Sequence, residues 1–340
     1  MNVLTRLSFL YALGVSLHRG AAMVGDPTFE HPHITSIGNL EAGGNGKTPL
    51  AMWLLARMSA QGKSCAYVSR GYGGVHVSKT AVTCVLAQNV LPASMAGLRV
   101  IARTNEHLAG AVGDEGAMVC ERVPLVSAFF CRDKVRAVQT ATACGADLIV
   151  LDDGFQSWRV PRHTDIVLLD AERPLDGGQL LPAGRLRELP SALSRADQII
   201  FNGAATAAAV TAARAQIELF LRPGVLVSGM QRRVVLTTPA GDEALPDAVF
   251  QAVSAIARPD AFQQSLVNAG VQVAAHYVFR DHHRYDARDI ERIVAGAREA
   301  NASAIVTTEK DWVKLRHFEM PLPVWIARLD VSLTEFQLLV

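Results

Sequence analysis

The sequence predicts an α/β protein in which helices cover both faces of a parallel sheet, followed by a second, smaller α/β domain. Two observations support this prediction. Apolar runs of strand length alternate with helical patterns, and such alternation requires crossovers between parallel strands. The composition also changes near residue 204, where an alanine-rich segment begins. At 340 residues the chain exceeds the usual size of one core, so we expect domains at 26–210 and 211–340.

The first domain is predicted from regularly spaced apolar segments. A strand at 34–37 is followed by a helix at 49–60, and a short buried strand at 64–69 leads into a glycine-rich loop. The clearest later helix covers 134–144, and Gly145 closes it. Further apolar runs of strand length lie at 125–130, 148–151, 166–169 and 198–201.

The second domain is predicted from a similar but shorter alternation. A strand at 232–238 and a turn at 239–241 indicate a hairpin. Asp286 is the expected N-cap of a helix that reaches residue 300, and Asp289 is its expected acid in the first turn. The remaining predicted elements are strands at 248–256, 271–279 and 304–307, and a helix at 260–268.

Composition and charge exclude several classes of protein. Half of the residues are hydrophobic and only 19% are charged, which favours packed cores over long disorder. A net charge of +1 gives no reason to expect a nucleic acid as partner. The five cysteines are odd in number and contain no Cys-x-x-Cys pair, which predicts buried, reduced thiols in a cytosolic protein.

Residues 1–25 form a separate hydrophobic segment. The apolar run from Leu7 to Leu17 is flanked by Arg6 and by His18-Arg19, and it has about half of the ~20 residues that a membrane-spanning helix needs. We therefore predict a helix that lies in the headgroup layer of a membrane. A first helix that packs on the core is an open alternative.

Residues 42–48 have the pattern of a phosphate-binding loop. Gly43, Gly44, Asn45 and Gly46 form a glycine-rich turn between the first predicted strand and the first predicted helix. Such a turn directs backbone N–H groups toward phosphate oxygens, and the helix N-terminus adds its positive dipole end. Lys47 would bridge the terminal phosphates, and Thr48 would bind Mg²⁺. The segment predicts a P-loop NTPase-like domain that binds a nucleoside triphosphate.

A second acidic motif follows an apolar strand. Residues 148–151 end in Asp152 and Asp153, as expected for the acids that organise Mg²⁺ beside a phosphate loop. Either carboxylate could hold the ion directly or through water. Two other motifs are weak when taken alone, since Asp114-Glu115 is typical of a helix N-terminus and Asp281-His282 of a structural pair.

Taken together, the motifs resemble one family, the tetraacyldisaccharide 4'-kinases, also called lipid A 4'-kinases. The resemblance covers nearly the whole chain, and its specificity comes from the order and spacing of the motifs. They are Asn39 to Pro49, Ser69 to Gly73, Gly113 to Glu115, Asp152 to Gln156, Leu181 to Glu188, Asp281-His282 and Thr307 to Asp311.

The resemblance implies an alcohol phosphotransferase that moves the γ-phosphoryl group of ATP to the 4'-hydroxyl of a tetraacylated glucosamine disaccharide 1-phosphate. The product would be lipid IVA, made on the cytoplasmic face of the inner membrane by a peripheral enzyme. A hydroxyl that attacks phosphorus must lose its proton, and the resemblance gives this base role to Asp114, with His282 as its partner. These two residues lie in different predicted domains, so the pair would form when the domains close.

The remaining site residues are also implied by the resemblance. Lys47, Thr48, Asp152 and Asp153 form the phosphate and Mg²⁺ set, Arg187 is a further catalytic position, and Glu188 is a further metal position. Where the family has an arginine that contacts phosphate, this chain has Lys134. Lysine keeps the charge but lacks the planar fork of a guanidinium group.

Three other functions remain to be weighed. A partition-type or metal-chaperone NTPase would hydrolyse nucleotide without a phosphoryl acceptor, but its signature lysine is replaced here by Ala42. A GTPase is disfavoured because residues 308–311 resemble the guanine-reading motif only superficially. A scaffold that binds ATP without turnover would leave Asp114, His282 and the turn at 181–184 without a role.

Overall fold

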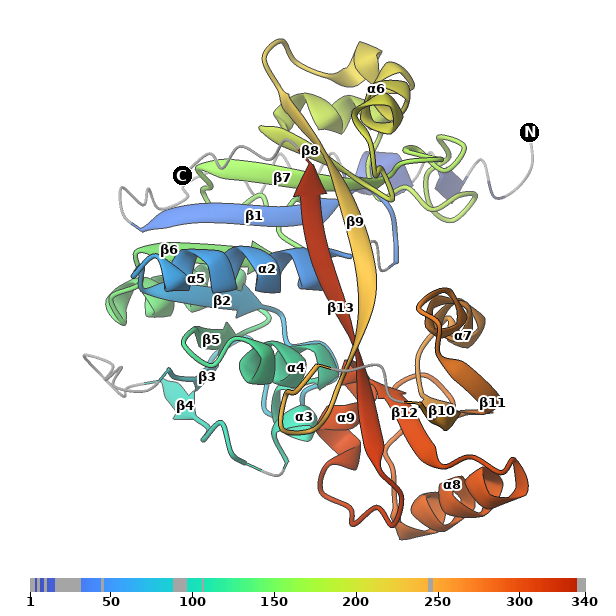
Figure 1. The fold of residues 1–340 in the computed structure, drawn as a ribbon. Helices are drawn as coiled ribbons and strands as arrows, with labels where there is room; N and C mark the ends of the chain where they lie inside the picture. The colour runs from blue at the N-terminus through green and yellow to red at the C-terminus, as the bar shows by residue number, and fades with distance from the viewer. Residues whose placement is uncertain are drawn as a thin grey trace.

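The structure is a computed structural model, and it describes residues 4, 7, 8, 11–15, 32–43, 46–87, 97–105, 107–243 and 247–334. Within these residues, 13 strands form one sheet in the order β11-β10-β12-β13-β9-β8-β7-β1-β6-β2-β5-β3-β4 (Figure 1). We call residues 32–225 the N-terminal part and residues 226–334 the C-terminal part. Most strand pairs are parallel, and the antiparallel pairs are β3 with β5 and β9 with β13.

The N-terminal part contains the first eight strands and helices between them. Its strands are β1 (His33–Asn39), β2 (Cys65–Ser69), β3 (Val82–Val85), β4 (Leu98–Val100), β5 (Ser127–Phe130), β6 (Leu148–Asp152), β7 (Thr164–Asp170) and β8 (Gln198–Asn202). Its helices are α2 (Lys47–Ala60), α3 (Leu108–Val112), α4 (Asp114–Arg122), α5 (Lys134–Ala143), α6 (Ala207–Ala215) and the 3-10 helices η1 (Pro190–Arg195) and η2 (Glu218–Phe220).

The C-terminal part has the same alternation of strands and helices. Its strands are β9 (Leu226–Thr237), β10 (Val249–Ser254), β11 (Gln272–Val278), β12 (Ala304–Thr308) and β13 (Val324–Thr334). Its helices are α7 (Pro259–Asn268), α8 (Ala287–Glu299) and α9 (Glu309–Leu315).

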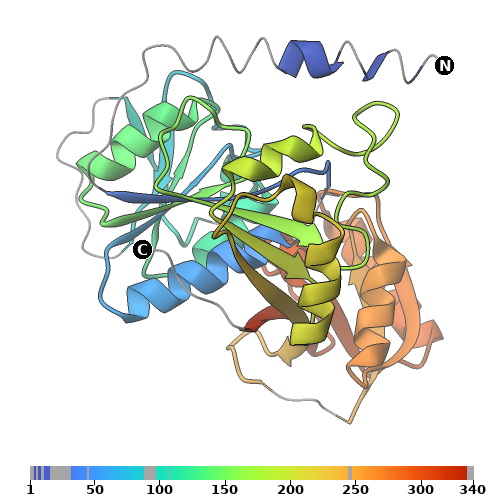
Figure 2. The same ribbon diagram turned by 90° about the horizontal axis from the view of Figure 1, so that it is seen from above.

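Helices cover both faces of the sheet, as predicted. Along β6, Leu148 and Val150 belong to the core under α2, whereas Ile149 and Leu151 belong to the core under α5. This alternation is the two-residue period of a strand with two buried faces. Figure 2 shows α2 and α5 on opposite sides of the strands. In the C-terminal part, α7 and α8 likewise pack in two different apolar clusters.

The hairpin predicted at the start of the C-terminal part is wrong in its pairing. The turn exists, because Gly241 N donates to Thr238 O at 2.9 Å. Beyond the turn, the pairing found among the described residues is an isolated bridge between Thr237 and Glu243. The long antiparallel partner of β9 is β13, so the two form a ribbon that runs between the two parts of the molecule (Figure 1).

Most of the alanine-rich segment at 204–213 lies in helix α6 (Ala207–Ala215). Thr206 caps α6 by accepting a hydrogen bond from Ala209 N, and Val210 and Ala213 are buried in the core beside β8. Alanine is the strongest helix former, so the composition change marks a secondary-structure element. The boundary that we place at residue 210 falls inside this helix, and the division into domains stays a prediction. Strands β3, β4 and β13 and helices α3 and α9 were not predicted.

The described residues of the N-terminal hydrophobic segment include a helical stretch at 11–15. Tyr11 and Ala12 pack against the core near β7 and β8, and Ser8 Oγ donates to Leu180 O at 2.9 Å. Leu4 and Leu13 are 45% and 51% exposed. The other residues of 1–25 lie outside the described residues. Among the described helices, none has the length and apolar character that crossing a bilayer requires.

The cysteines are free thiols, as predicted. Cys65, Cys84, Cys120 and Cys131 are buried, and Cys144 is half-buried. Burial raises the pKa of Cys65 to about 11 and the pKa of Cys84 and of Cys120 to about 12. Thiols with such pKa values are poor nucleophiles at neutral pH.

The start of α8 confirms the predicted capping box. Asp286 accepts a hydrogen bond from Asp289 N at 3.0 Å, and the Asp289 carboxylate accepts one from Asp286 N at 3.2 Å. We expect Asp286→Ala to lower the free energy of unfolding by about 0.5–2 kcal/mol, the usual value of an N-cap. Urea unfolding measures this change. Arg288→Ala, at an exposed position of the same helix, is the control, and equal losses in both variants would contradict the prediction.

Candidate active site

The predicted site residues of the N-terminal part converge at one edge of the sheet. Strands β1, β2 and β6 are adjacent and parallel, so their carboxyl ends meet at that edge. The glycine-rich loop follows β1, the 70–74 loop follows β2, and Asp152 ends β6. Loops at the carboxyl ends of parallel strands form the ligand sites of α/β proteins.

The glycine-rich loop has the backbone geometry that its sequence predicts. Gly46 is the N-cap of α2 and has a φ of 90°, and Gly43 has a φ of 123°. These values favour glycine because a side chain would clash with the backbone. Lys47 Nζ donates to Gly43 O at 3.2 Å and to Asn39 Oδ1 at 3.1 Å, so the lysine folds back over the loop. Gly44 and Asn45 lie outside the described residues.

Asp152 has one satisfied oxygen and one free oxygen. Its Oδ2 accepts hydrogen bonds from Tyr67 Oη at 2.5 Å and from Thr48 Oγ1 at 3.3 Å. Its Oδ1 is buried without a hydrogen-bond partner among the described residues. A buried carboxylate oxygen without a partner is costly unless a cation or a donor binds there. Asp152 therefore has the character of a metal ligand.

Asp153 serves a different purpose from its neighbour. Its backbone is in the left-handed region, with a φ of 49°. Arg187 donates to both of its oxygens at 2.9 Å, and Lys47 Nζ lies 3.5 Å from Oδ1. Burial opposes ionisation of Asp153, but Lys47, Arg187 and Lys134 together hold its pKa below the usual value. Asp153 thus holds the side chains of Arg187 and Lys47 in place.

Lys134 lies behind the acidic turn. It is 5% exposed, and its ammonium group donates to Asp152 O at 2.6 Å and to Asp153 O at 2.7 Å. Both bonds hold the backbone that carries the two carboxylates. Two of the three donors of the Lys134 ammonium group are engaged by these carbonyl groups. Its contact with a nucleotide stays a prediction.

The segment Leu181 to Glu188 braces the glycine-rich loop. Ala42 N donates to Arg185 O at 2.7 Å, and Arg187 N donates to Leu40 O at 2.7 Å. Glu188 is 5% exposed, and its Oε1 accepts hydrogen bonds from Arg195 at 3.0 Å and Gln156 at 3.1 Å. The predicted metal role of Glu188 is untested, whereas its structural role in this network is evident.

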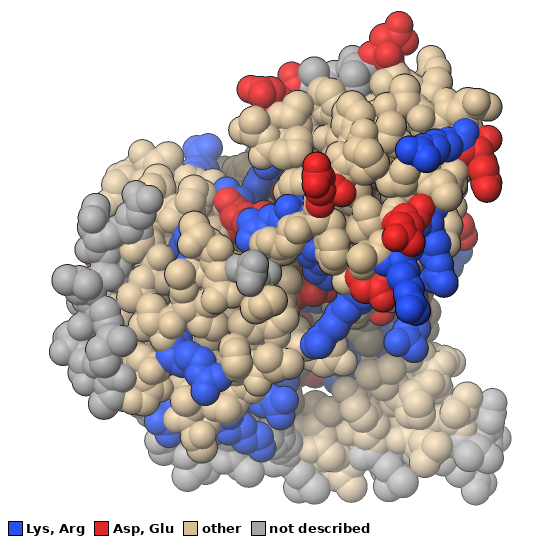
Figure 3. All heavy atoms as spheres, turned by 90° about the horizontal axis from the view of Figure 1, so that it is seen from below, with Lys and Arg blue, Asp and Glu red and all other residues tan. Residues whose placement is uncertain are grey.

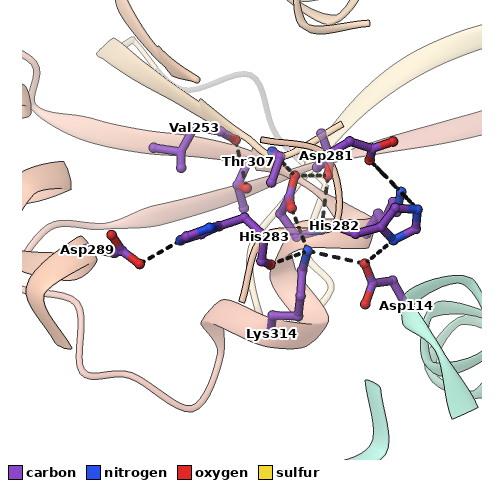
Figure 4. Close-up of polar contacts among 12 residues, drawn as sticks. Asp114, Val253, Asp281, His282, His283, Asp289, Thr307 and Lys314 are labelled. Atoms are coloured by element: carbon purple, nitrogen blue, oxygen red, sulfur yellow. Dashed lines mark hydrogen bonds and ion pairs between the residues drawn. The ribbon is translucent and has the colours of Figure 1, made fainter. Parts of the chain in front are cut away.

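Asp114 and His282 meet across the two parts of the molecule. Asp114 begins α4, and its Oδ2 lies 3.1 Å from Nδ1 of His282 (Figure 4). Lys310 Nζ lies 3.3 Å from Nε2 of the same ring. Because an ammonium group only donates, Nε2 accepts, and Nδ1 carries the hydrogen that it donates to Asp114. The structure thus brings together the two residues that sequence motifs far apart predict as a pair.

The loop that carries His282 is held on its other side by α8. His282 has a φ of 60°, and the next residue, His283, bonds through Nε2 to Asp289 Oδ2 at 2.7 Å. The His283 ring also stacks on Phe279 at a centroid distance of 4.7 Å. The capping box of α8 therefore fixes a loop of the candidate site (Figure 4).

Glu115 connects the Asp114–His282 pair to the phosphate loop. Burial raises its pKa, and the nearby Asp152 raises it further. Lys310, Lys47 and His282 oppose this shift. The charges of Asp152 and Lys47 from one cluster, and of Lys310 and His282 from the other, therefore all act on the carboxyl group of Glu115.

Some residues of the site were missed by the sequence analysis. Tyr67, which bonds to Asp152, lies within an apolar strand pattern. Its hydroxyl group was the one feature of the sequence that could indicate a polar role. Lys310 belongs to a recognised motif without an assigned role. Arg122 donates to Glu309 at 2.7 Å and to Asp330 at 2.5 Å, across the two parts of the molecule. Along this junction, Lys and Arg side chains lie beside Asp and Glu side chains (Figure 3).

The fold and the site define a P-loop nucleotide-binding protein: a lysine-bearing glycine loop begins a helix after a parallel strand, and the neighbouring strand ends at an acidic pair. The family model described as Tetraacyldisaccharide-1-P 4'-kinase matches residues 1–339. The chain belongs to this family.

Individual relatives agree with the family assignment. A tetraacyldisaccharide 4'-kinase of Geobacter metallireducens is 35% identical over 98% of this chain and 95% of that protein. One from Anaeromyxobacter sp. (strain Fw109-5) is 37% identical over 83% of this chain and 73% of that protein. The crystal structure of LpxK from Aquifex aeolicus in complex with ATP has a TM-score of 0.70 and 24% identity, covers 97% of this chain and 94% of that one, and supports the fold.

Lys134 generates a pH prediction. Burial lowers its pKa from 10.5 to about 8, and Arg70 contributes, although Asp153 and Asp152 oppose the shift. Between these two pKa values the unfolded chain binds the proton and the folded chain does not, so the contribution of Lys134 to stability rises with pH. Relative to Lys134→Met, the wild type should gain up to about 1.4 kcal/mol per pH unit in this window.

Urea unfolding of both proteins at several pH values between 7.5 and 10 measures the gain. Lys79→Met, at an exposed position of the same part, is the control and should show no such slope. A constant difference between wild type and Lys134→Met would contradict the lowered pKa.

Proposed function

We propose that this chain transfers the γ-phosphoryl group of ATP to the 4'-hydroxyl of a tetraacylated glucosamine disaccharide 1-phosphate and so makes lipid IVA. The observation that carries the proposal is the contact between Asp114 and His282, in which a histidine holds a carboxylate. It is supported by Glu115, the next residue, whose carboxyl group interacts electrostatically with Asp152 and Lys47. A switch NTPase has no acceptor to deprotonate, so it would not need this pair. Family membership likewise does not favour a partition- or chaperone-type NTPase.

The phosphate groups are bound by the loop and by cations around it. Gly43 and Gly46 shape the loop, and Lys47 at the start of α2 carries a positive charge beside it. Arg187 is anchored by Asp153 and remains 25% exposed, so it can also reach a phosphate oxygen. ATP as the donor is further supported by the relative from Aquifex aeolicus, whose structure contains ATP.

Thr48 and Asp152 are the residues that we propose for Mg²⁺. The free Oδ1 of Asp152 and the nearby Thr48 hydroxyl are hard oxygen ligands, as Mg²⁺ prefers. Asp153 and Glu188 are engaged by arginines, so they act at most through water. The described residues contain no cluster of His, Cys, Asp or Glu that could hold a metal alone, so phosphate and water oxygens would complete the site. When bound, the ion offsets negative charge on the phosphates.

Asp114 acts as the general base. The 4'-hydroxyl oxygen forms a bond to the γ-phosphorus, the bond from that phosphorus to the bridging oxygen of ADP breaks, and the hydroxyl proton passes to Asp114. His282 donates its Nδ1 hydrogen to Asp114 and thereby orients the carboxylate. Since the pair joins the two parts of the molecule, a complete site exists only when they are in contact, which excludes water as a competing acceptor.

The acylated substrate implies contact with a membrane surface, and we propose that the chain works as a peripheral protein on the cytoplasmic face of the inner membrane. Leu4, Leu7 and Leu13 are exposed on the N-terminal segment, while Tyr11 and Ala12 pack inward. Ser8 ties this segment to the turn at 180–183 that braces the glycine-rich loop. Apolar side chains on its outer face suit the headgroup layer.

The activity is tested by incubating the protein with Mg-ATP and the disaccharide 1-phosphate lipid. A bisphosphorylated lipid, seen by mass spectrometry, is expected. Asp114→Asn should lower kcat by about 10²- to 10⁴-fold with ATP affinity nearly unchanged, because it removes only the base.

Glu121→Gln is the matched control, since Glu121 lies on the same helix and also pairs across the two parts, with Arg316. It should keep most of the activity. ATP hydrolysis without lipid product would support the switch NTPase, and near-normal turnover of Asp114→Asn would remove Asp114 from the mechanism.

The membrane contact predicts that Leu4→Ser with Leu13→Ser weakens binding to anionic vesicles at least tenfold. Each leucine loses about 1.5–3 kcal/mol when it can no longer be fully buried, and tenfold corresponds to about 1.4 kcal/mol. Cosedimentation measures vesicle binding, and nucleotide binding should persist. Leu125→Ser with Leu219→Ser is the control, because these leucines are 69% and 95% exposed elsewhere on the surface. Equal behaviour of both variants would mean that the segment is structural.

A further inference from the structure

Helix α9 carries two lysines that have no role in the proposed reaction. It begins in the motif Thr307 to Asp311, and its lysines, Lys310 and Lys314, are one turn apart. Residues three or four apart lie on the same face of a helix, so both lysines project toward the same neighbour. That neighbour is the pair of Asp114 and His282: Lys310 bonds to His282, and Lys314 bonds to Asp114.

Lys314 has partners in three different segments. Its Nζ donates to Asp114 Oδ2 in α4 at 3.3 Å and to His283 O, in the loop that carries His282, at 3.1 Å (Figure 4). It also forms an ion pair with Asp311 Oδ1 in α9 at 3.1 Å. An ammonium group has three N–H donors. Two of them donate to Asp114 and His283, and the charge of the group also pairs with Asp311. The side chain is only 9% exposed, and its Nζ also lies 5.4 Å from the ring centroid of Tyr285.

The anchor of Lys314 is rigid. Asp311 is fully buried, and its Oδ2 accepts hydrogen bonds from Ala255 N at 2.9 Å and from Thr308 Oγ1 at 2.7 Å. These bonds fix the carboxylate between β10 and the start of α9. Contacts within the C-terminal part therefore hold the ammonium group of Lys314 in place independently of Asp114.

We propose that Lys314 is a positioning residue that aligns the carboxylate of Asp114 with His282. It grips the backbone of His283, the neighbour of His282, and the side chain of Asp114, so one ammonium group sets the spacing of the pair. The inference rests on the proposed function only in that Asp114 is the base. A displacement of about 1 Å at a reacting group can cost about 10²-fold in rate, so such alignment matters for turnover.

A purely structural role for Lys314 predicts a different outcome. Arg316, two residues after Lys314, also pairs across the junction, with Glu121, which lies seven residues after Asp114 in α4. If Lys314 only held the two parts together, the loss of either cation would have similar consequences. If Lys314 aligns the base, only its own loss should slow the chemical step.

The test uses the full-length chain with Mg-ATP and the lipid acceptor. Lys314→Met, which keeps the length of the side chain but not the charge, should lower kcat by about 10- to 100-fold, with KM for ATP changed less than about twofold. Arg316→Met should keep kcat within about threefold of wild type. Lys314→Arg, which restores the charge, should recover part of the loss even though its planar fork suits the three acceptors less well.

The variants are then combined with Asp114→Asn. When the base is absent, Lys314→Met should cause no further loss of kcat, because a positioning residue acts through the group that it positions. Normal turnover of Lys314→Met, or additive losses in the double variant, would overturn the role of Lys314 while Asp114 remains the base. Near-normal turnover of Asp114→Asn alone would overturn the proposed base itself. Should Lys314→Met not fold, the double-variant comparison is made with Lys314→Arg.

Discussion

The site depends on a balance of charges at one edge of the sheet. Asp114, Glu115, Asp152 and Asp153 gather there, and carboxylates so close together repel one another unless cations lie between them. The cations come from segments far apart in the sequence: Lys47 from the glycine-rich loop, Arg187 from the bracing turn, and Lys310 and Lys314 from α9. The sheet edge is stable only when these segments converge. Charge pairing therefore couples the assembly of the site to the assembly of the fold.

The ribbon of β9 and β13 is the element that makes this convergence possible. It pairs Gly229 with Thr334 at one end and Thr237 with Ile326 at the other, and so connects the sheet of the N-terminal part to that of the C-terminal part. Helix α9 lies between β12 and β13 in the chain, so the position of the ribbon also fixes α9 against α4. The ion pairs of Arg122 with Glu309 and Asp330 hold the far end of α4, and Lys314 holds its beginning. A helix clamped at both ends presents Asp114 in one place.

Local patterns predicted much of this structure, and long-range contacts account for the rest. The glycine-rich loop, the strand that ends in Asp152 and the capping box of Asp286 are confirmed because each is encoded within a few neighbouring residues. The pairing of β9 with β13 could not be predicted, since an apolar strand pattern does not name its partner. The contacts of Lys314 were missed for the same reason: a lysine one turn after a motif looks like an exposed side chain until the fold brings Asp114 to it.

The candidate site contains one residue with a left-handed backbone in each part of the molecule. Asp153 and His282, one in each part, both adopt the left-handed conformation, which costs energy for residues with a side chain. Arg187 holds the side chain of Asp153, and the bond between His283 and Asp289 holds the loop that carries His282. Neither strained residue is needed to complete a strand or a helix. The two left-handed residues instead lie at contacts of the candidate site: Asp153 pairs with Arg187 and Lys47, and His282 contacts Asp114, the proposed base.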